Sequence, residues 1–412
     1  MSSIWMDVPT LQVNENQLQN FVSFIYKNEQ ILKEFGAMKI QLNDSCKLSL
    51  KKRRNNLILV PNNEQIVKIN SDENIYSLHE VDHIDEPIQQ SSLMIDEHDF
   101  WSSLSSSSNK QRFTNTSTLP NKSFFQKKIH PSHFNIHRLP EQSLLQLGGN
   151  KVTQQFVPCI KRAHGPGSIS QMTTAKQHLF SIDYHHEGGA RHWYIIPHYQ
   201  RKSLQKIINR HNSSCCLDHG QILIDPSVLD NNRIRYHRII QRSNELVVIS
   251  AGTLTQSFTE NANWSESIEF ALPSWIEDGH ANASISSCRC NAFQDSSRNV
   301  IDITLFRHEL IQKYITFNLS NITDDKSISL KDDKNMDMDT ISTQNTTTIN
   351  SSNVENMMQT NEELIIPLEP IVPPSQSSST TWVTPSISSY FSEEDKNKSV
   401  DNNAQLQYEV LE

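Results

Sequence analysis

The sequence predicts a mainly β domain with flanking helices, and short apolar runs in the middle of the chain carry most of the argument. These runs are rich in β-branched residues and are separated by turn residues, as expected for the strands of a sandwich or a barrel. Two stretches with helical spacing complete the pattern. The predicted strands are Leu179–Tyr184, Trp193–Pro197, Gln221–Ile224 and Leu246–Ser250.

The two helical stretches lie before and between these strands. The first is predicted to begin near Asn14 to Asn16, because apolar residues follow at positions i, i+3, i+4 and i+7. The second, Gln200–His211, reads as a surface helix inserted between strands. The apolar positions are Leu18, Phe21, Val22 and Ile25 in the first stretch and Leu204, Ile207 and Ile208 in the second.

Composition indicates that part of the chain does not fold into a core. Of 412 residues, 36% are hydrophobic, and the mean hydropathy is −0.55. From about Asp324 onward the sequence is polar and lacks apolar periodicity, which predicts a disordered tail. The polar stretch Ser102–Lys122 is likewise predicted to be a surface insertion.

Charge and cysteine usage exclude several classes of protein. The net charge of −9 argues against a basic nucleic-acid-binding body, so direct DNA binding is not expected, although Lys51–Arg54 forms a short basic patch. Without a long apolar run or a signal-peptide pattern, we expect an intracellular chain with no membrane contact. In a reducing compartment the six cysteines favour free thiols or a metal site over disulfides.

Four motifs follow one another in the middle of the chain: His186–Pro197, Leu223–Leu229, Gln241–Glu245 and Glu266–Ala271. In order and spacing they resemble the JmjC domain of histone lysine demethylases. Fainter similarities at Val8–Thr10 and Lys33–Gly36 resemble the JmjN segment, while Phe100-Trp101 and Phe134–Leu139 resemble connecting pieces of the subfamily that acts on trimethyl-lysine of histone H3.

The resemblance implies a double-stranded β-helix barrel, similar to cupins, and a division of the chain. The expected parts of the chain are a JmjN-like segment at 7–50, a connecting region with a disordered insertion at 51–125, the JmjC-like barrel at 126–280, a zinc-binding helical part at 281–320 and the disordered tail at 324–412.

In the family the barrel binds iron(II) and 2-oxoglutarate through two histidines and one carboxylate on one face of the metal. Counting from the matched motifs places these ligands at Thr173, Ala175 and Thr255. A threonine hydroxyl is a poor neutral ligand for iron(II), and alanine has no donor atom. We therefore expect no tight iron binding and no catalysis at these positions.

The positions implied for 2-oxoglutarate are also altered. The family's lysine that pairs with the co-substrate falls on Arg191, and its asparagine partner falls on Asp183. A carboxylate at the second position would repel a dianion. The simpler interpretation is a salt bridge between the two side chains inside an empty barrel.

A relocated iron site is the alternative to a lost one. Asp183, His185 and Glu187 alternate along a predicted strand, so their side chains should share one face. His185 and Glu187 would supply the His-x-carboxylate half of a metal triad. The nearest distal histidine is His280, which follows the last predicted strand.

A structural zinc site is implied as well. The resembling subfamily holds zinc with three cysteines and one histidine, a normal tetrahedral set. The candidate ligands here are Cys215 or Cys216, His219, Cys288 and Cys290.

Together these features predict a nuclear, chromatin-associated protein that is catalytically degenerate and binds a histone tail or chromatin proteins. The first alternative is an active iron(II)- and 2-oxoglutarate-dependent histone H3 lysine demethylase with misaligned or relocated ligands. A duplicate without a selected role is the other.

Overall fold

The structure is a computed structural model that describes part of the chain. The described residues are 6–43, 46–51, 59, 63–69, 74–80, 95–106, 111–114, 116–127, 133–211, 217, 222–282 and 300–320. The chain divides into two units, residues 1–329 and 330–412, and every described residue belongs to the first. The predicted tail at 324–412 lies outside the described residues.

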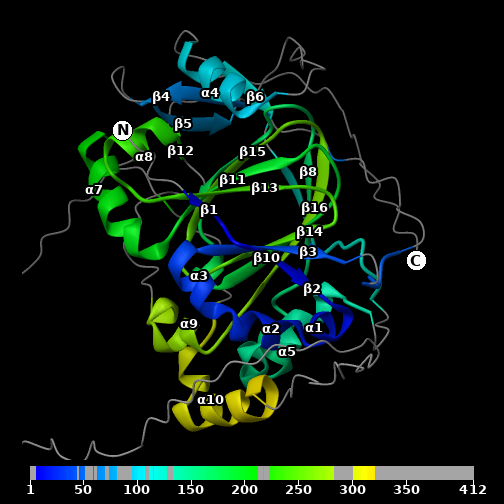
Figure 1. Ribbon diagram of the computed structural model, residues 1–412. Helices are drawn as coiled ribbons and strands as arrows, with labels where there is room; N and C mark the ends of the chain where they lie inside the picture. The colour runs from blue at the N-terminus through cyan, green and yellow to red at the C-terminus, as the bar shows by residue number, and fades with distance from the viewer. Residues whose placement is uncertain are drawn as a thin grey trace, which may run out of the picture. The chain divides into compact units, whose positions relative to one another are not determined.

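Two sheets curve around a common interior and form the barrel (Figure 1). Neighbouring strands are antiparallel, except that β2 runs parallel to β3 and β1 parallel to β13. The larger sheet holds β2 (Thr10–Val13), β3 (Ala37–Leu42), β14 (Glu245–Ile249), β10 (Phe180–Gly188), β16 (Asn263–Phe270), β8 (Cys159–Ala163) and β7 (Ser117–Pro120). The smaller sheet holds β1 (Met6–Asp7), β13 (His237–Gln241), β11 (Arg191–Ile196), β15 (Leu254–Thr259) and β9 (Ile169–Thr173).

The four predicted strands are all present. They correspond to β10, β11, β14 and β12 (Ile222–Ile224). The strand β12 joins a third sheet with β5 (Ile75–Glu80), β4 (Asn63–Lys68) and β6 (Gln111–Thr114). The mainly β architecture with flanking helices is therefore confirmed.

The prediction of a surface insertion at Ser102–Lys122 is wrong. This stretch contains the end of α4 (Glu97–Ser106) and the strands β6 and β7. β7 pairs with β8 and lies at the edge of the larger sheet. An edge strand and an amphipathic helix need few apolar residues, so the polar composition concealed regular structure.

The amphipathic N-terminal helix is confirmed, with a break at Asn20. α1 (Glu15–Gln19) begins at Asn14, whose side chain accepts a hydrogen bond from the Gln17 amide, while the Gln17 side chain accepts one from the Asn14 amide. This reciprocal cap fixes the helix start. α2 (Phe21–Lys27) and α3 (Glu29–Phe35) follow. The predicted apolar positions Leu18, Phe21, Val22 and Ile25 are all buried.

Gly36 ends α3 and directs the chain into the barrel. Its φ of 76° lies in the left-handed region, and a Cβ there would lie 3.1 Å from Ile195 Cγ2 and 3.2 Å from Pro197 Cα. Glycine is favoured by both the backbone conformation and this close approach. The chain then enters β3, which pairs with β14 and β2, so the N-terminal segment completes the larger sheet.

Helices cover the outer faces of both barrel sheets (Figure 1). α1 to α3 pack in one apolar cluster with residues of β10, β14 and β16 and with α5 (Leu139–Gln142), α6 (Asn150–Thr153), α9 (Ser274–Glu277) and α10 (His308–Tyr314). A second cluster joins the third sheet to α4, the predicted helix α7 (Arg201–His211) and α8 (Pro226–Asn231). None of the helices within the described ranges has the length and hydrophobicity to cross a membrane.

A buried His–Glu pair ties the larger sheet to the segment that precedes the barrel. His186 Nε2 lies 3.1 Å from Glu266 Oε2, and both side chains are fully buried. The same carboxylate oxygen accepts a hydrogen bond from the Phe124 amide at 3.0 Å. The His186 ring packs edge-on against Phe124 and Tyr184. Loss of the imidazole would therefore leave a buried carboxyl group short of a partner.

Replacing this imidazole with an apolar ring tests its contribution to stability. His186→Phe is expected to lower the free energy of unfolding by about 3 kcal/mol, because Glu266 stays buried without its partner. Urea unfolding followed by circular dichroism measures the change.

His192→Phe is the matched control, since His192 pairs with Glu260 at a partly exposed site and should lose less than about 1 kcal/mol. Equal losses in the two variants would contradict a special role for the buried pair.

Candidate functional site: a polar cup inside the barrel

A cavity of about 250 Å³ lies between the two barrel sheets. Both sheets contribute to its wall, which is rich in hydroxyl and amide side chains and carries few charges. The side chains used below come from β8, β9, β10, β11, β15 and β16. The wall comprises Cys159, Lys161, Ser170, Gln171, Thr173, Thr174, Ala175, Ser181, Ile182, Asp183, Trp193, Ile249, Thr253, Thr255, Gln256, Ser257, Ser267, Ile268 and Glu269.

The three positions that the sequence assigned to iron ligands meet in this cup. Thr173 ends β9 and is the direct cross-strand partner of Thr255 on β15, while Ala175 follows two residues later in the same wall. Counting from the motifs thus brought together residues that are about 80 positions apart in the chain. Their side chains offer two neutral hydroxyl groups and one methyl group.

The turn that follows Ala175 is held in place by the C-terminal part of the barrel. Gln177 and His178 both have positive φ values, 47° and 54°, which non-glycine residues seldom adopt. The Gln177 carbonyl accepts a hydrogen bond from Trp275 Nε1, and its side-chain oxygen accepts one from the Ile301 amide, both at 2.9 Å. These contacts fix the backbone on which Ala175 lies.

Asp183 provides the main charge of the cup and lies between two cations. Its Oδ2 atom is 3.1 Å from Lys161 Nζ and 3.4 Å from Arg191 Nη1. The contact between Asp183 and Arg191 is the salt bridge that the sequence predicted. Lys161 was not predicted, because β8 lies outside the matched motifs. The sequence around Lys161 does not indicate a contact with a charged side chain.

The cations keep the Asp183 carboxylate ionised. Burial by itself raises the pKa of this group, but the charges of Lys161 and Arg191 outweigh that effect and hold the pKa below its ordinary value of 3.8. An opposite charge at this distance favours the ionised form. The cup therefore contains its own anion, with both neighbouring cations directed at it.

Arg191 is fixed from a second side. Its guanidinium lies over the Trp193 ring, 5.3 Å from the ring centroid. Trp193 Nε1 in turn donates a hydrogen bond to Gln241 Oε1, and the Gln241 amide donates to the Asp183 carbonyl. These contacts position Arg191 against Asp183 and limit its freedom to turn toward another anion.

The relocated metal ligands do not lie on one face. A bulge interrupts β10 between His185, which pairs with Ser265, and Glu187, which pairs with Trp264. Because adjacent residues of β16 face opposite sides of the sheet, the bulge places His185 and Glu187 on opposite sides too. His185 is fully buried and Glu187 is exposed. The prediction that Asp183, His185 and Glu187 share one face is therefore wrong for Glu187, because the bulge changes the side on which it lies.

Cys159 and Glu269 of the cup wall, and the nearby buried His185, lie in environments that disfavour their charged forms. Burial raises the pKa of the Cys159 thiol, and burial also raises the pKa of Glu269. Burial, with the neighbouring Arg191 charge, lowers the pKa of His185 to about 4. A neutral thiol is a poor nucleophile. Among the residues that the structure describes, no group of three His, Cys, Asp or Glu side chains is arranged to hold a metal ion.

The zinc prediction is not tested by the structure. Its candidate ligands Cys215, Cys216, His219, Cys288 and Cys290 all lie outside the described residues.

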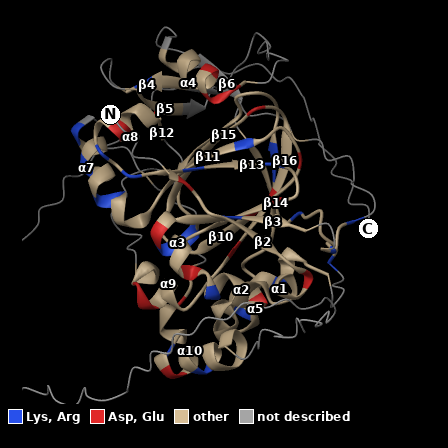
Figure 2. Cartoon of the chain, in the orientation of Figure 1, with Lys and Arg blue, Asp and Glu red and all other residues tan. Residues whose placement is uncertain are grey.

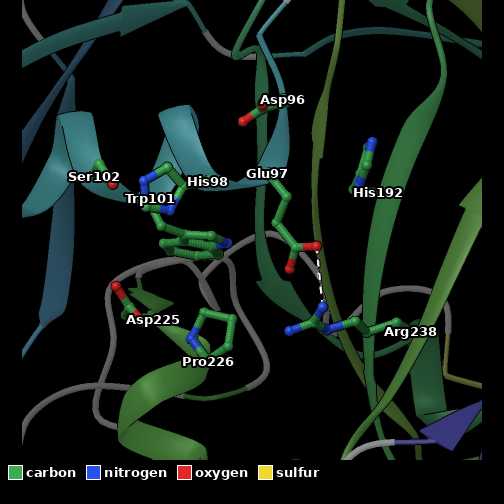
Figure 3. A pocket seen from close by; sticks show the side chains of 9 residues that line it. All are labelled: Asp96, Glu97, His98, Trp101, Ser102, His192, Asp225, Pro226 and Arg238. Atoms are coloured by element: carbon green, nitrogen blue, oxygen red, sulfur yellow. Dashed lines mark hydrogen bonds and ion pairs between the residues drawn. The ribbon is translucent and has the colours of Figure 1, made fainter.

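A second, larger hollow lies on the outside of the barrel, where α4 meets β11 and β13 (Figure 3). Its volume is about 570 Å³. The Glu97 carboxylate at its centre accepts a hydrogen bond from the Tyr194 hydroxyl at 2.7 Å and lies 3.1 Å from Arg238 Nη1. Trp101 Nε1 donates to the same hydroxyl. These contacts attach α4 to the barrel wall, so we interpret the polar groups there as structural.

The fold and the cup together define a cupin-like double-stranded β-helix barrel. A family model for the JmjC domain, described as a hydroxylase, matches residues 164–270. Residues 164–270 are therefore similar to the JmjC domain, and proteins with this domain generally depend on iron(II) and 2-oxoglutarate. The resemblance found in the sequence is thereby confirmed for the barrel.

Curated relatives support the same family. The chain is 34% identical over 114 residues to multicopy suppressor of chk1 protein 1 of Schizosaccharomyces pombe, covering 26% of this chain and 7% of that protein. It is 35% identical over 123 residues to the human probable lysine-specific demethylase 4F, covering 28% and 19%. It is 26% identical over 213 residues to Lid2 complex component lid2 of S. pombe, covering 45% and 14%. Each match spans less than a quarter of the relative.

The cup does not fit the iron that the family implies. A facial triad requires imidazole nitrogens and a carboxylate oxygen on one side of the metal, whereas Thr173, Ala175 and Thr255 supply none of these atoms. The carboxylate that is present, Asp183, is paired with Lys161 and Arg191. No chemical step can therefore be assigned to iron at this position.

The charge arrangement of the cup predicts a coupled response to mutation. Arg191→Met should lower the free energy of unfolding by about 2 kcal/mol, because Asp183 then keeps only one of its cations. The double variant D183L/R191M should recover most of this loss, since the Asp183 carboxylate is then no longer buried with one cation missing. Chemical denaturation of both variants measures the coupling; a double variant that is less stable than R191M contradicts it.

The depressed pKa of Asp183 predicts a pH dependence of stability. Its contribution is complete above the ordinary value of 3.8 and is lost as the pH falls through the lower folded-state pKa. The stability difference between the native chain and Asp183→Asn should therefore be constant near neutral pH and should shrink in acid. Denaturation series at several pH values, with both proteins in the same buffers, detect this. A difference that grows below pH 3.8 contradicts the assignment.

Proposed function

We propose that this chain is a chromatin-associated JmjC-family protein whose barrel has lost catalysis and acts as a scaffold for a histone tail or a chromatin partner. The observation that carries the proposal is the meeting of Thr173, Ala175 and Thr255 in one cup. These residues occupy the positions that the resemblance assigns to the iron ligands. A barrel with hydroxyl and methyl groups there has lost the metal chemistry while keeping its shape.

The co-substrate site supports the same proposal. A dicarboxylate that enters the cup meets the Asp183 carboxylate, with a repulsion of roughly 4 kcal/mol at about 4 Å and an effective dielectric near 20. Lys161 and Arg191 offset this repulsion only in part, because both already contact Asp183, although Arg191 Nε and Nη2 have no hydrogen-bond partner within the described residues. The cup therefore disfavours 2-oxoglutarate even when the metal is left out of consideration.

The partner class follows from the relatives. They include proteins named as lysine-specific demethylases and as a component of the Lid2 complex. Folds can be kept for binding after an activity is lost, because binding and catalysis depend on different residues. We propose that the chain works in the nucleus, and that the N-terminal segment at 7–50, which completes the larger sheet, serves as its JmjN-like part.

A structural zinc belongs to this proposal. Cys215 or Cys216, together with His219, Cys288 and Cys290, would form the tetrahedral set. A closed zinc site contributes directly to folding, so a scaffold has reason to keep it while losing iron. Metal analysis of protein purified without chelators should find one zinc per chain, and Cys288→Ser with Cys290→Ser should abolish it. Retention of zinc by the double variant contradicts this ligand set.

The activity prediction is tested on the full chain by measuring metal content and succinate formation. We expect no bound iron and no succinate above background when iron(II), 2-oxoglutarate, oxygen and methylated histone H3 peptides are supplied. Iron retention with succinate production would instead establish the alternative, an active demethylase with relocated ligands. Peptide binding without turnover supports the scaffold role.

Restoring the ligands gives a positive test of the site assignment. Thr173→His, Ala175→Glu and Thr255→His together should create a facial set that binds manganese(II) or cobalt(II), because the three positions line one cup. Cobalt absorption spectra and calorimetric titration measure the binding. The native chain is the control. It contains the alternative ligand pair His185 and Glu187 and should bind neither manganese(II) nor cobalt(II). Failure of a folded triple variant to bind metal contradicts the placement of the lost iron site.

A further inference from the structure

The exposed face of α7 consists only of side chains that can donate hydrogen bonds. Lys202, Lys206 and Arg210 are exposed, and the helix contains no acidic residue (Figure 2). Gln205, Asn209 and Ser203 fill the positions between the cations. The opposite face is apolar and buried, through Leu204, Ile207 and Ile208.

The cations repeat at i, i+4 and i+8 and therefore form a line along the helix. Successive members are about 6 Å apart along the axis, because each residue rises about 1.5 Å. None of Lys202, Lys206 and Arg210 has an ion-pair partner within the described part of the chain. They form a compact positive strip on a chain whose net charge is −9.

This arrangement opposes helix stability. Like charges at i and i+4 destabilise a helix, and so do cations in its first turn, where Arg201 and Lys202 lie. An acidic residue at any of the exposed positions would relieve the repulsion. Departures from local preference without a structural gain tend to mark functional surfaces.

We propose that the exposed face of α7 contacts the phosphate backbone of duplex DNA without reading its sequence. The side-chain types on this face, Lys, Arg, Ser, Asn and Gln, are those that commonly bind DNA phosphates. The net charge of the chain excludes a body-wide attraction for DNA, so the contact is local and weak. It is independent of the cup and of the scaffold function proposed above.

The test is fluorescence anisotropy of a labelled duplex of about 20 base pairs, titrated with the full chain at several salt concentrations. With three phosphates neutralised, the slope of log K against log salt should be about −2.7, which is a loss of affinity of about 40-fold between about 50 and 200 mM salt. The variant K202A/K206A/R210A should abolish this salt-dependent binding.

The matched control removes the same charge elsewhere. K122A/K151A/K313A replaces three exposed lysines outside α7 and should keep both the affinity and the slope. The α7 variant should also unfold at an equal or higher temperature, because the like-charge repulsion within the helix is gone. That result separates lost binding from lost folding.

Three outcomes overturn the proposal. The first is an absence of salt-dependent DNA binding by the native chain. The second is an equal loss of binding in the α7 and control variants. The third is binding of polyglutamate but not of DNA, which would identify the strip as a surface for an acidic protein. Histone-peptide binding should be the same in the α7 variant and the native chain, so failure here leaves the proposed function untouched.

Discussion

Asp183 carries its charge between the two sheets of the barrel, where an isolated carboxylate would be strongly disfavoured. Lys161 and Arg191 offset that penalty from two different strands, β8 and β11, one in each sheet. The charge of the Asp183 carboxylate is therefore compensated by the protein itself. An enzyme of this fold would leave charges in the cup for its metal and co-substrate, whereas this barrel pairs them with each other.

Local pattern was sufficient to predict most of the barrel. The apolar runs at Leu179–Tyr184 and Leu246–Ser250 mark strands because they are short and largely buried on both faces, and Leu18 to Ile25 marks a helix because its apolar residues recur at positions i, i+3, i+4 and i+7. The prediction for Ser102–Lys122 was wrong because it also relied on apolar pattern. β7 is an edge strand, and its alternating exposure leaves little apolar signal in the sequence.

The site was predictable where only distance along the chain was needed. Thr173 and Thr255 could be placed by counting residues from the matched motifs, and they prove to be cross-strand partners. Glu187 could not, because a bulge two residues after Asp183 reverses the side on which later side chains lie. Lys161 escaped prediction since its contact with Asp183 depends on the order of β8, β16 and β10 in the sheet.

The Asp183 carboxylate of the cup is paired with opposite charges, whereas the α7 cations Lys202, Lys206 and Arg210 are not paired with any described residue. This difference helps to identify which surface is functional. Inside the barrel, the Asp183 carboxylate is matched by cations within 3.4 Å, as expected when folding alone constrains the residues. On α7 the cations face solvent and one another, which lowers helix stability. Buried charges must be neutralised for the chain to fold, but nothing in folding requires an acid-free basic strip.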